Sequence, residues 1–95
     1  MNDATHIEVV HNAAQNRFEV HLDGQLGRLE YQAADGVLAI NHTEVPAALG
    51  GRGLAGALVG AVVAYAREAG LRVVPNCSYA RSWLERHPES RGAAT

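Results

Sequence analysis

Hydrophobic and polar residues alternate through most of the first half of the chain, a pattern that is typical of half-buried β-strands. The clearest stretch is the one in which Phe18, Val20 and Leu22 alternate with polar neighbours. Asp-Gly pairs at 23–24 and 35–36 are strong hairpin signals, because both residue types tolerate the positive φ angles of tight turns. The pattern therefore predicts an antiparallel meander of four strands, at residues 6–11, 17–23, 26–31 and 37–45.

After residue 50 the apolar positions recur with the period of a helix. Leu54 and Leu58 are spaced four residues apart in Ala-rich sequence, and Gly70 can adopt the left-handed conformation that ends a helix. Pro75 is expected to stop the short strand that follows. The predicted elements are a long helix, a fifth strand and a short C-terminal helix, at residues 53–69, 71–74 and 79–87.

Length and composition place the chain among small globular domains. Of its 95 residues 47% are hydrophobic and 19% are charged, so we expect a single α+β domain over residues 1–95, with 89–95 as a frayed tail. The net charge of −2 gives no electrostatic basis for binding nucleic acid or an anionic membrane. Cys77 is the only cysteine, so no internal disulfide can form, and no Cys/His spacing matches a zinc site. We therefore expect a cytoplasmic protein without a metal.

A glycine-rich turn joins the fourth strand to the long helix. Residues 46–56 read Pro-Ala-Ala-Leu-Gly-Gly-Arg-Gly-Leu-Ala-Gly, and small residues there let the main chain approach a diphosphate at the helix N-terminus. Arg52 could add a charge-assisted contact to such an anion. The alternative is a connection that binds nothing, although an ordinary connection needs fewer glycines.

Two other phosphate-binding motifs fit this turn less well. The spacing Gly51-x-Gly53-x-x-Gly56 matches the dinucleotide fingerprint, but that motif needs a parallel βαβ unit and an acidic residue about 20 positions further on. A nucleotide triphosphate loop needs a lysine, and all eight basic residues of this chain are arginines. Binding of NAD is therefore kept only as a third interpretation.

The order of these elements resembles the acetyl-CoA core of the GNAT acetyltransferase superfamily. That core has a β-meander, a turn of the type (Gln/Arg)xxGx(Gly/Ala), a long helix and a short strand. Gly53 and Ala55 match the turn, whereas Gly50 stands where Gln or Arg is usual and so removes one side-chain contact. Further short motifs resemble the very small YjdJ-like acetyltransferase family: His42-Thr-Glu-Val-Pro46, Gly51-Arg-Gly-Leu-Ala55, Pro75-x-Cys77-Ser-Tyr79 and Arg86-His-Pro88.

The resemblance implies a minimal GNAT fold that binds acetyl-CoA and transfers acetyl to an amine of a small molecule or a peptide. It implies that strands four and five splay apart, that pantetheine lies in the gap, and that the acceptor site is shallow or shared with a partner. His42 and Cys77 are then expected to meet at the ends of these two strands. The implied acetyl-CoA contacts are Glu44, Val45, Gly50, Gly51, Arg52, Gly53, Leu54 and Ala55.

Four side chains are candidates for the chemistry. Cys77 precedes a predicted helix start, whose dipole can lower a thiol pKa, so it could carry the acetyl group covalently, serve as a small polar contact, or simply fill the core. His42 could act as general base or face solvent, and Glu44 shares its strand face and could orient it. Tyr79 could protonate the departing thiolate, although Trp83 stands near the position of the family tyrosine and cannot donate in this way. The remaining histidines are expected on exposed faces: His6, His11, His21 and His87.

Two functions from different classes remain open at this point. The first is an N-acetyltransferase, which the expected meeting of His42 with Cys77 favours. The second is a non-catalytic acyl-CoA-binding module or sensor subunit, which the short chain favours because it leaves little room for acceptor architecture. Both predict CoA affinity, and only the first predicts turnover.

Overall fold

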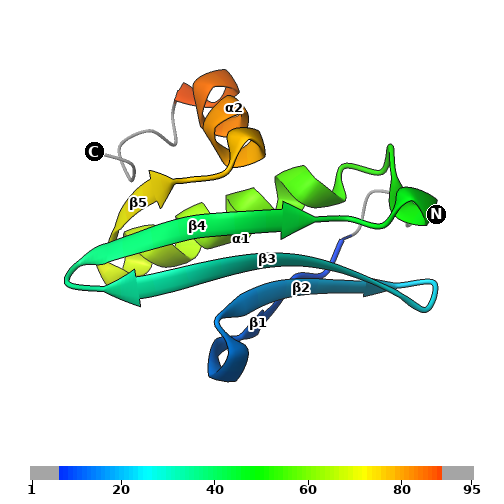
Figure 1. Ribbon diagram of the computed structural model, residues 1–95, viewed down its shortest axis with the longest axis horizontal. Coiled ribbons are helices and arrows are strands. Elements are labelled where there is room, and N and C mark those ends of the chain that lie inside the picture. Colours follow the sequence, from blue (N-terminus) through cyan, green and yellow to red (C-terminus); the bar gives the residue numbers. More distant parts are fainter. Residues whose placement is uncertain (1–6, 89–95) are drawn as a thin grey trace.

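Five strands form one sheet in which each strand lies beside the next in sequence (Figure 1). In this computed structural model, which describes residues 7–88, the first four strands are antiparallel and the fifth runs parallel to the fourth. The strands are β1 (Val10–Asn12), β2 (Arg17–Leu22), β3 (Gln25–Ala34), β4 (Val37–Glu44) and β5 (Arg72–Pro75). The predicted α+β class with its meander and fifth strand is confirmed. The predicted tail, 89–95, lies outside the described residues.

One long helix covers one face of this sheet (Figure 1). Helix α1 (Leu54–Ala69) ends at Gly70, whose φ of 73° is the left-handed conformation predicted for it. Helix α2 (Ser78–Arg86) packs against α1 and the last two strands, and two 3-10 turns, η1 (Ala13–Gln15) and η2 (Ala47–Leu49), join the elements. The core lies between the sheet and α1, and its completely buried members include Leu29, Leu38, Ile40, Leu58 and Val62.

Several strand boundaries differ from the sequence prediction, and β3 extends to Ala34 where the predicted strand ended at residue 31. Strand β1 begins only at Val10, and its last residue, Asn12, caps η1 by accepting a hydrogen bond from the Gln15 amide. Strand β5 includes Pro75, which was predicted to stop it. Because β5 is an edge strand, the missing amide of Pro75 costs no ladder hydrogen bond on its outer side.

A β-bulge interrupts the pairing of β3 with β4. Tyr31 pairs with Ile40, whereas the preceding residue Glu30 pairs with His42, so Asn41 is the extra residue of β4. An extra residue shifts the alternation of side chains by one position from there on. Beyond Asn41, each β4 side chain therefore lies on the face opposite to the one that regular alternation from Ile40 would give it.

The bulge decides which β4 side chains face the helix. Thr43 pairs directly with Leu29, a completely buried core residue, so Thr43 lies on the face that α1 covers. His42 and Glu44 lie on the opposite face, which we call the outer face. The charged and titratable side chains on the outer face of β2, β3 and β4 include Arg17, Glu19, His21, Arg28, Glu30, His42 and Glu44.

Glu19 is a buried charge on this otherwise open face. Its side chain is 7% exposed, and its carboxylate accepts hydrogen bonds from His21, Asn12 and Arg17. These hydrogen bonds, with that from His21 the largest influence, lower the pKa of Glu19 to about 2. Because the ionised form is the one held in the fold, its contribution to stability is complete at pH values above the unfolded pKa.

The stability of the fold is therefore expected to depend on pH through Glu19. Its contribution, about 3 kcal/mol, should be lost as the pH falls from about 4.5 to below 2, since protonation breaks the hydrogen bonds to the carboxylate. Urea unfolding at a series of pH values measures this loss. The Glu19→Gln variant should show a shallower fall over the same range. Parallel pH profiles for the two proteins would contradict the assignment.

His11 is not on an exposed face, contrary to prediction. Its ring pairs with Phe18 across β1 and β2 and stacks on it, with centroids 4.1 Å apart and planes 8° from parallel. Its Nε2 shares a 2.6 Å hydrogen bond with the Tyr31 hydroxyl, and Tyr65 of α1 packs edge-on at 4.6 Å. Cross-strand pairing with a core residue places His11 on the covered face, and burial lowers its pKa.

The other three histidines that were predicted on exposed faces differ in their outcomes. His21 is 63% exposed, as expected. His87 is half-buried instead, because its ring stacks on Trp83 with centroids 3.9 Å apart and its Nδ1 lies 2.7 Å from the Trp83 carbonyl oxygen. His6 lies outside the described residues.

Candidate functional site

A cavity of about 250 Å³ lies between the glycine-rich turn and the start of α2, and we call it the glycine cavity. All the side chains or backbone positions predicted to contact acetyl-CoA line it, except Glu44 and Arg52. Its wall also contains Leu49, Gly56 and Tyr79. The predicted cofactor residues are thus brought together around one space.

The backbone of the glycine cavity fits an anionic group. Gly51 and Gly53 have φ angles of 80° and 77°, in the left-handed region that favours glycine, and a Cβ at either would meet no atom within 4 Å. Gly53 is the N-cap residue of α1 and, having no side chain, makes no capping hydrogen bond to the first helical amides. These amides and the positive end of the helix dipole are suited to a diphosphate.

Strands β4 and β5 separate beside this cavity. Their pairing ends at Ile40 and Pro75, and the Asn76 amide still donates to the Ile40 carbonyl oxygen at 2.9 Å. Beyond that point β4 continues to Glu44 while the chain from β5 turns into α2 (Figure 1). The splaying that the family resemblance implied is therefore present. Val45, the residue after the end of β4, lines the glycine cavity.

Helix α2 brings Tyr79 into the cavity wall and packs Trp83 on α1. A Cβ on Gly56 would lie 3.3 Å from both the Tyr79 hydroxyl and Trp83 Nε1, and one on Gly60 would lie 3.5 Å from the Trp83 ring. Glycine at these positions therefore lets α2 approach closely. Trp83 is a partly buried packing residue beside the site.

Alanine at the two α1 glycines is expected to have opposite effects on stability. Gly60→Ala should stabilise by up to about 1 kcal/mol, because alanine is the better helix former and its methyl makes an ordinary contact with Trp83. Gly56→Ala should gain nothing, because its methyl would push against Tyr79 and Trp83. Thermal unfolding of both variants measures the difference. Equal stabilisation by the two variants would show that α2 can shift to accommodate the added methyl at residue 56 without a cost in stability.

Cys77 lies where the sequence predicted, between a strand end and a helix start. Its Sγ caps α2 by accepting a hydrogen bond from the Ala80 amide at 3.4 Å, and it is 3.6 Å from the Thr43 hydroxyl oxygen. The expectation that Cys77 meets His42 is wrong, because the bulge turns Thr43 rather than His42 towards α2. Thr43 could not be identified from the sequence, because no feature of the sequence marks the bulge.

His42 lies on the outer face with the carboxylate that was predicted to orient it. Its Nε2 donates to Glu44 Oε1 at 3.2 Å, and Arg28 Nη2 lies 3.1 Å from the same oxygen. The hydrogen bond from His42, followed by the charge of Arg28, lowers the pKa of Glu44, so this carboxylate is ionised and can only accept. An imidazole that donates from Nε2 carries its acceptor lone pair on Nδ1.

Arg52 has a partner that the sequence did not suggest. Its guanidinium lies 3.0 Å from Asp23 Oδ2, in the turn between β2 and β3, and both side chains are about half exposed. An exposed ion pair of this kind contributes little to stability. Arg52 does not line the glycine cavity in this arrangement, so the backbone rather than this side chain forms the anion cradle.

Within residues 7–88 no helix combines the length and the apolar character that crossing a membrane requires. The same residues contain no cluster of three or more His, Cys, Asp or Glu side chains able to hold a metal ion.

Comparisons with known proteins agree with this geometry. The family model for GCN5-related N-acetyltransferases matches residues 17–93. A solution NMR structure of a GCN5-like candidate N-acetyltransferase from Staphylococcus aureus superimposes with a TM-score of 0.71 at 32% identity, covering 88% of this chain and 83% of that one. A comparison with curated proteins gives no match. The chain belongs to the GCN5-related N-acetyltransferase family.

Proposed function

We propose that the protein binds acetyl-CoA in the glycine cavity and transfers the acetyl group to an amine. The observation that carries this proposal is the glycine cavity, in which an uncapped helix start lies beside the end of β4. Family membership supports acetyl transfer in general. The ordered motifs support placement in the YjdJ-like group, and the single cysteine and net charge of −2 support a cytoplasmic enzyme without a nucleic-acid or membrane partner.

Backbone groups hold the cofactor in this proposal. The amides of Leu54 and Ala55, at the start of α1, bind the diphosphate, and Gly51 and Gly53 leave it room to approach. The backbone of residues 44–45 hydrogen-bonds the pantetheine arm. Acetyl-CoA supplies the thioester whose acetyl group is transferred.

The transfer needs an amine that loses a proton as it attacks. The amine nitrogen forms a bond to the thioester carbonyl carbon, the carbon–sulfur bond breaks, and CoA leaves as its thiolate. His42 takes the proton from the nitrogen, and its hydrogen bond to Glu44 stabilises the resulting imidazolium. Tyr79, in the cavity wall, protonates the thiolate and regains its proton from solvent.

Direct attack by the amine is favoured over a route through acetylated Cys77. A thiol nucleophile is activated by an adjacent base. Among the described residues, the hydrogen-bonding neighbours of the Cys77 sulfur are the Ala80 amide and the Thr43 hydroxyl, and neither is a base. We assign Cys77 the role of capping α2 beside the site.

Release of free thiol from acetyl-CoA, measured with a panel of amines, tests this function. We expect amine-dependent release that Cys77→Ser retains within about threefold, because serine is a strongly preferred helix cap. Intact-protein mass is the second measurement. An acetyl adduct on the wild type that is absent from Cys77→Ser would establish the covalent route instead. Bound CoA with release at only the hydrolysis rate for every amine would favour the non-catalytic acyl-CoA module.

A further inference from the structure

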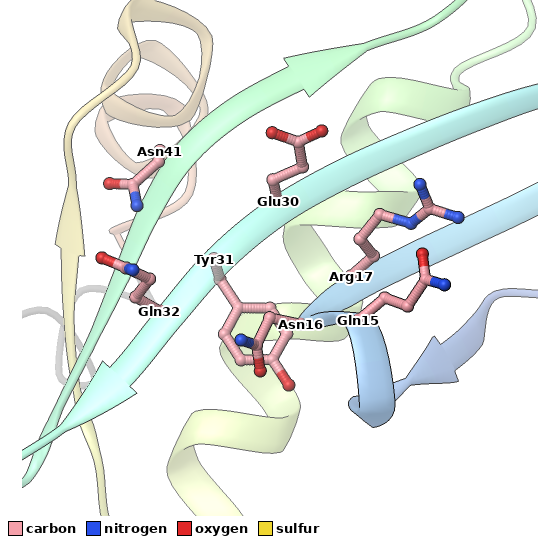
Figure 2. A pocket seen from close by; sticks show the side chains of 7 residues that line it. All are labelled: Gln15, Asn16, Arg17, Glu30, Tyr31, Gln32 and Asn41. Atoms are coloured by element: carbon pink, nitrogen blue, oxygen red, sulfur yellow. The ribbon is translucent and has the colours of Figure 1, made fainter.

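A second cavity, of about 420 Å³, lies at the bulge between β3 and β4, and we call it the bulge cavity. Figure 2 shows Gln15 and Arg17 on one side of it, Gln32 and Asn41 on the other, and Glu30 between them. Arg17 and Glu30 are register partners on the outer face, so the cavity opens on the side of the sheet away from α1. It is separate from the glycine cavity.

The lining of the bulge cavity is polar. Besides Tyr31 it consists of residues with side-chain amides, one guanidinium and one carboxylate. Amides can both donate and accept hydrogen bonds, which suits hydroxyl or amide groups on a ligand. Its volume is near the low end of the roughly 300–1,000 Å³ that is usual for ligand pockets. A small hydrophilic compound therefore fits this cavity better than an apolar one.

Glu30 gives the cavity an anionic group. Arg28 Nε donates to its Oε2 at 2.8 Å, and that hydrogen bond lowers the pKa of Glu30, which is therefore ionised at neutral pH. Its Oε1 accepts no hydrogen bond from the other described residues. The side chain is 43% exposed, so this oxygen can accept a hydrogen bond from an ammonium group.

The cavity also borders on the place where β4 and β5 separate. Glu30 is the register partner of His42, the proposed base. Asn41 Oδ1 accepts a 3.0 Å hydrogen bond from Asn76 Nδ2, and Asn76 directly precedes Cys77. His42 is not part of the cavity wall, but a ligand that contacts Glu30 lies one cross-strand pair from it, on the opposite side of β4 from Thr43 and Cys77.

From this juxtaposition we infer that the bulge cavity binds the acceptor, and that the acceptor is a small primary amine carrying hydroxyl or amide groups, of the size of an amino acid amide or an amino sugar. The inference rests on the proposed acetyl transfer. Glu30 pairs with the ammonium form and the side-chain amides bind its polar groups. The ammonium releases one proton to solvent to become the attacking amine, and His42 removes the second proton as the carbon–nitrogen bond forms.

Backbone amide NMR of the labelled full chain tests the inference in the presence of saturating CoA. The probes are glucosamine, serinamide and, as the apolar comparison, benzylamine. We expect glucosamine and serinamide to shift the amides of Asn16, Gln32 and Asn41 with saturation at millimolar concentration, and benzylamine to leave them unshifted.

Variants connect these shifts to the carboxylate. Glu30→Gln keeps the shape of the side chain and removes its charge, so it should raise the dissociation constant of glucosamine about fivefold. Gln32→Ala leaves the ion pair between Arg28 and Glu30 intact. It should raise the dissociation constant of glucosamine about threefold, which corresponds to one lost hydrogen bond of modest strength. The matched control is Glu68→Gln, which removes an exposed charge from α1. This substitution should change the dissociation constant of glucosamine less than about twofold.

The outcomes separate this inference from the function on which it rests. Shifts that are absent, that map to other residues, or that are equally sensitive to Glu30→Gln and Glu68→Gln would overturn the acceptor site even if CoA binds. Failure of CoA itself to shift the glycine-rich turn would instead overturn the proposed function.

Discussion

Replacing Gly53 by alanine is expected to weaken CoA binding by about tenfold or more, the effect of losing one or two hydrogen bonds to a charged group. Gly53 begins α1 with a φ of 77°, and the added Cβ would project into open space rather than into the protein. That space is the approach to the first helical amides, where the diphosphate is proposed to lie. The methyl would hold the anion away from its donors. Calorimetric titration with CoA measures the change.

Gly36→Ala is the matched control for this experiment. Gly36 has nearly the same φ, 78°, and its Cβ would also meet no atom within 4 Å, but it lies in the turn between β3 and β4. Both variants should lose a similar stability, about 1–2 kcal/mol, from the strained backbone. Only Gly53→Ala should lose CoA affinity. Equal affinities in the two variants would show that the turn does not bind the cofactor.

The His42→Ala variant is expected to lower kcat by about 100-fold, the lower range for removal of a general base. Its KM for acetyl-CoA should stay unchanged, because His42 lies on the outer face and not in the glycine cavity. The hydrogen bond from Nε2 to Glu44 determines which ring nitrogen acts as the general base, because it leaves Nδ1 to accept the proton. Steady-state kinetics with an amine identified by thiol release measure both parameters.

His21→Ala is the control for His42→Ala. His21 is also an exposed histidine on the outer face, and its Nε2 lies 2.9 Å from a carboxylate two residues away, Glu19. It belongs to β2, away from the point where β4 and β5 separate. We expect its kcat to stay within about twofold of the wild type, as for a surface substitution far from the chemistry. Equal losses in both variants would assign the effect to the charge of the outer face instead.

The features that could be predicted from the sequence are those whose signals are local. Gly70 ends α1 in the left-handed conformation because only glycine adopts it without strain. The Asp-Gly pairs at 23–24 and 35–36 form the two hairpin turns because Asp and Gly both tolerate the positive φ angles that these residues have. Gly51 and Gly53 likewise mark the turn before α1, and the cavity that they line lies where the motif placed the cofactor.

The features that could not be predicted depend on pairing between distant residues. The bulge at Asn41 exists only because β3 and β4 shift register, and it separates His42 from Cys77 by turning them to opposite faces. Arg52 was expected at the anion, but its partner Asp23 comes from a hairpin turn that folding brings beside it. Alternation along one strand cannot reveal either arrangement.

The central claim is that the backbone at the start of α1 binds the diphosphate of acetyl-CoA. Titrating the labelled protein with CoA while following each backbone amide by NMR tests it most directly. We expect the largest shifts on residues 50–56 and on Tyr79, and we expect them to saturate together. No shifts at millimolar CoA, or shifts confined to the outer face of the sheet, would contradict it.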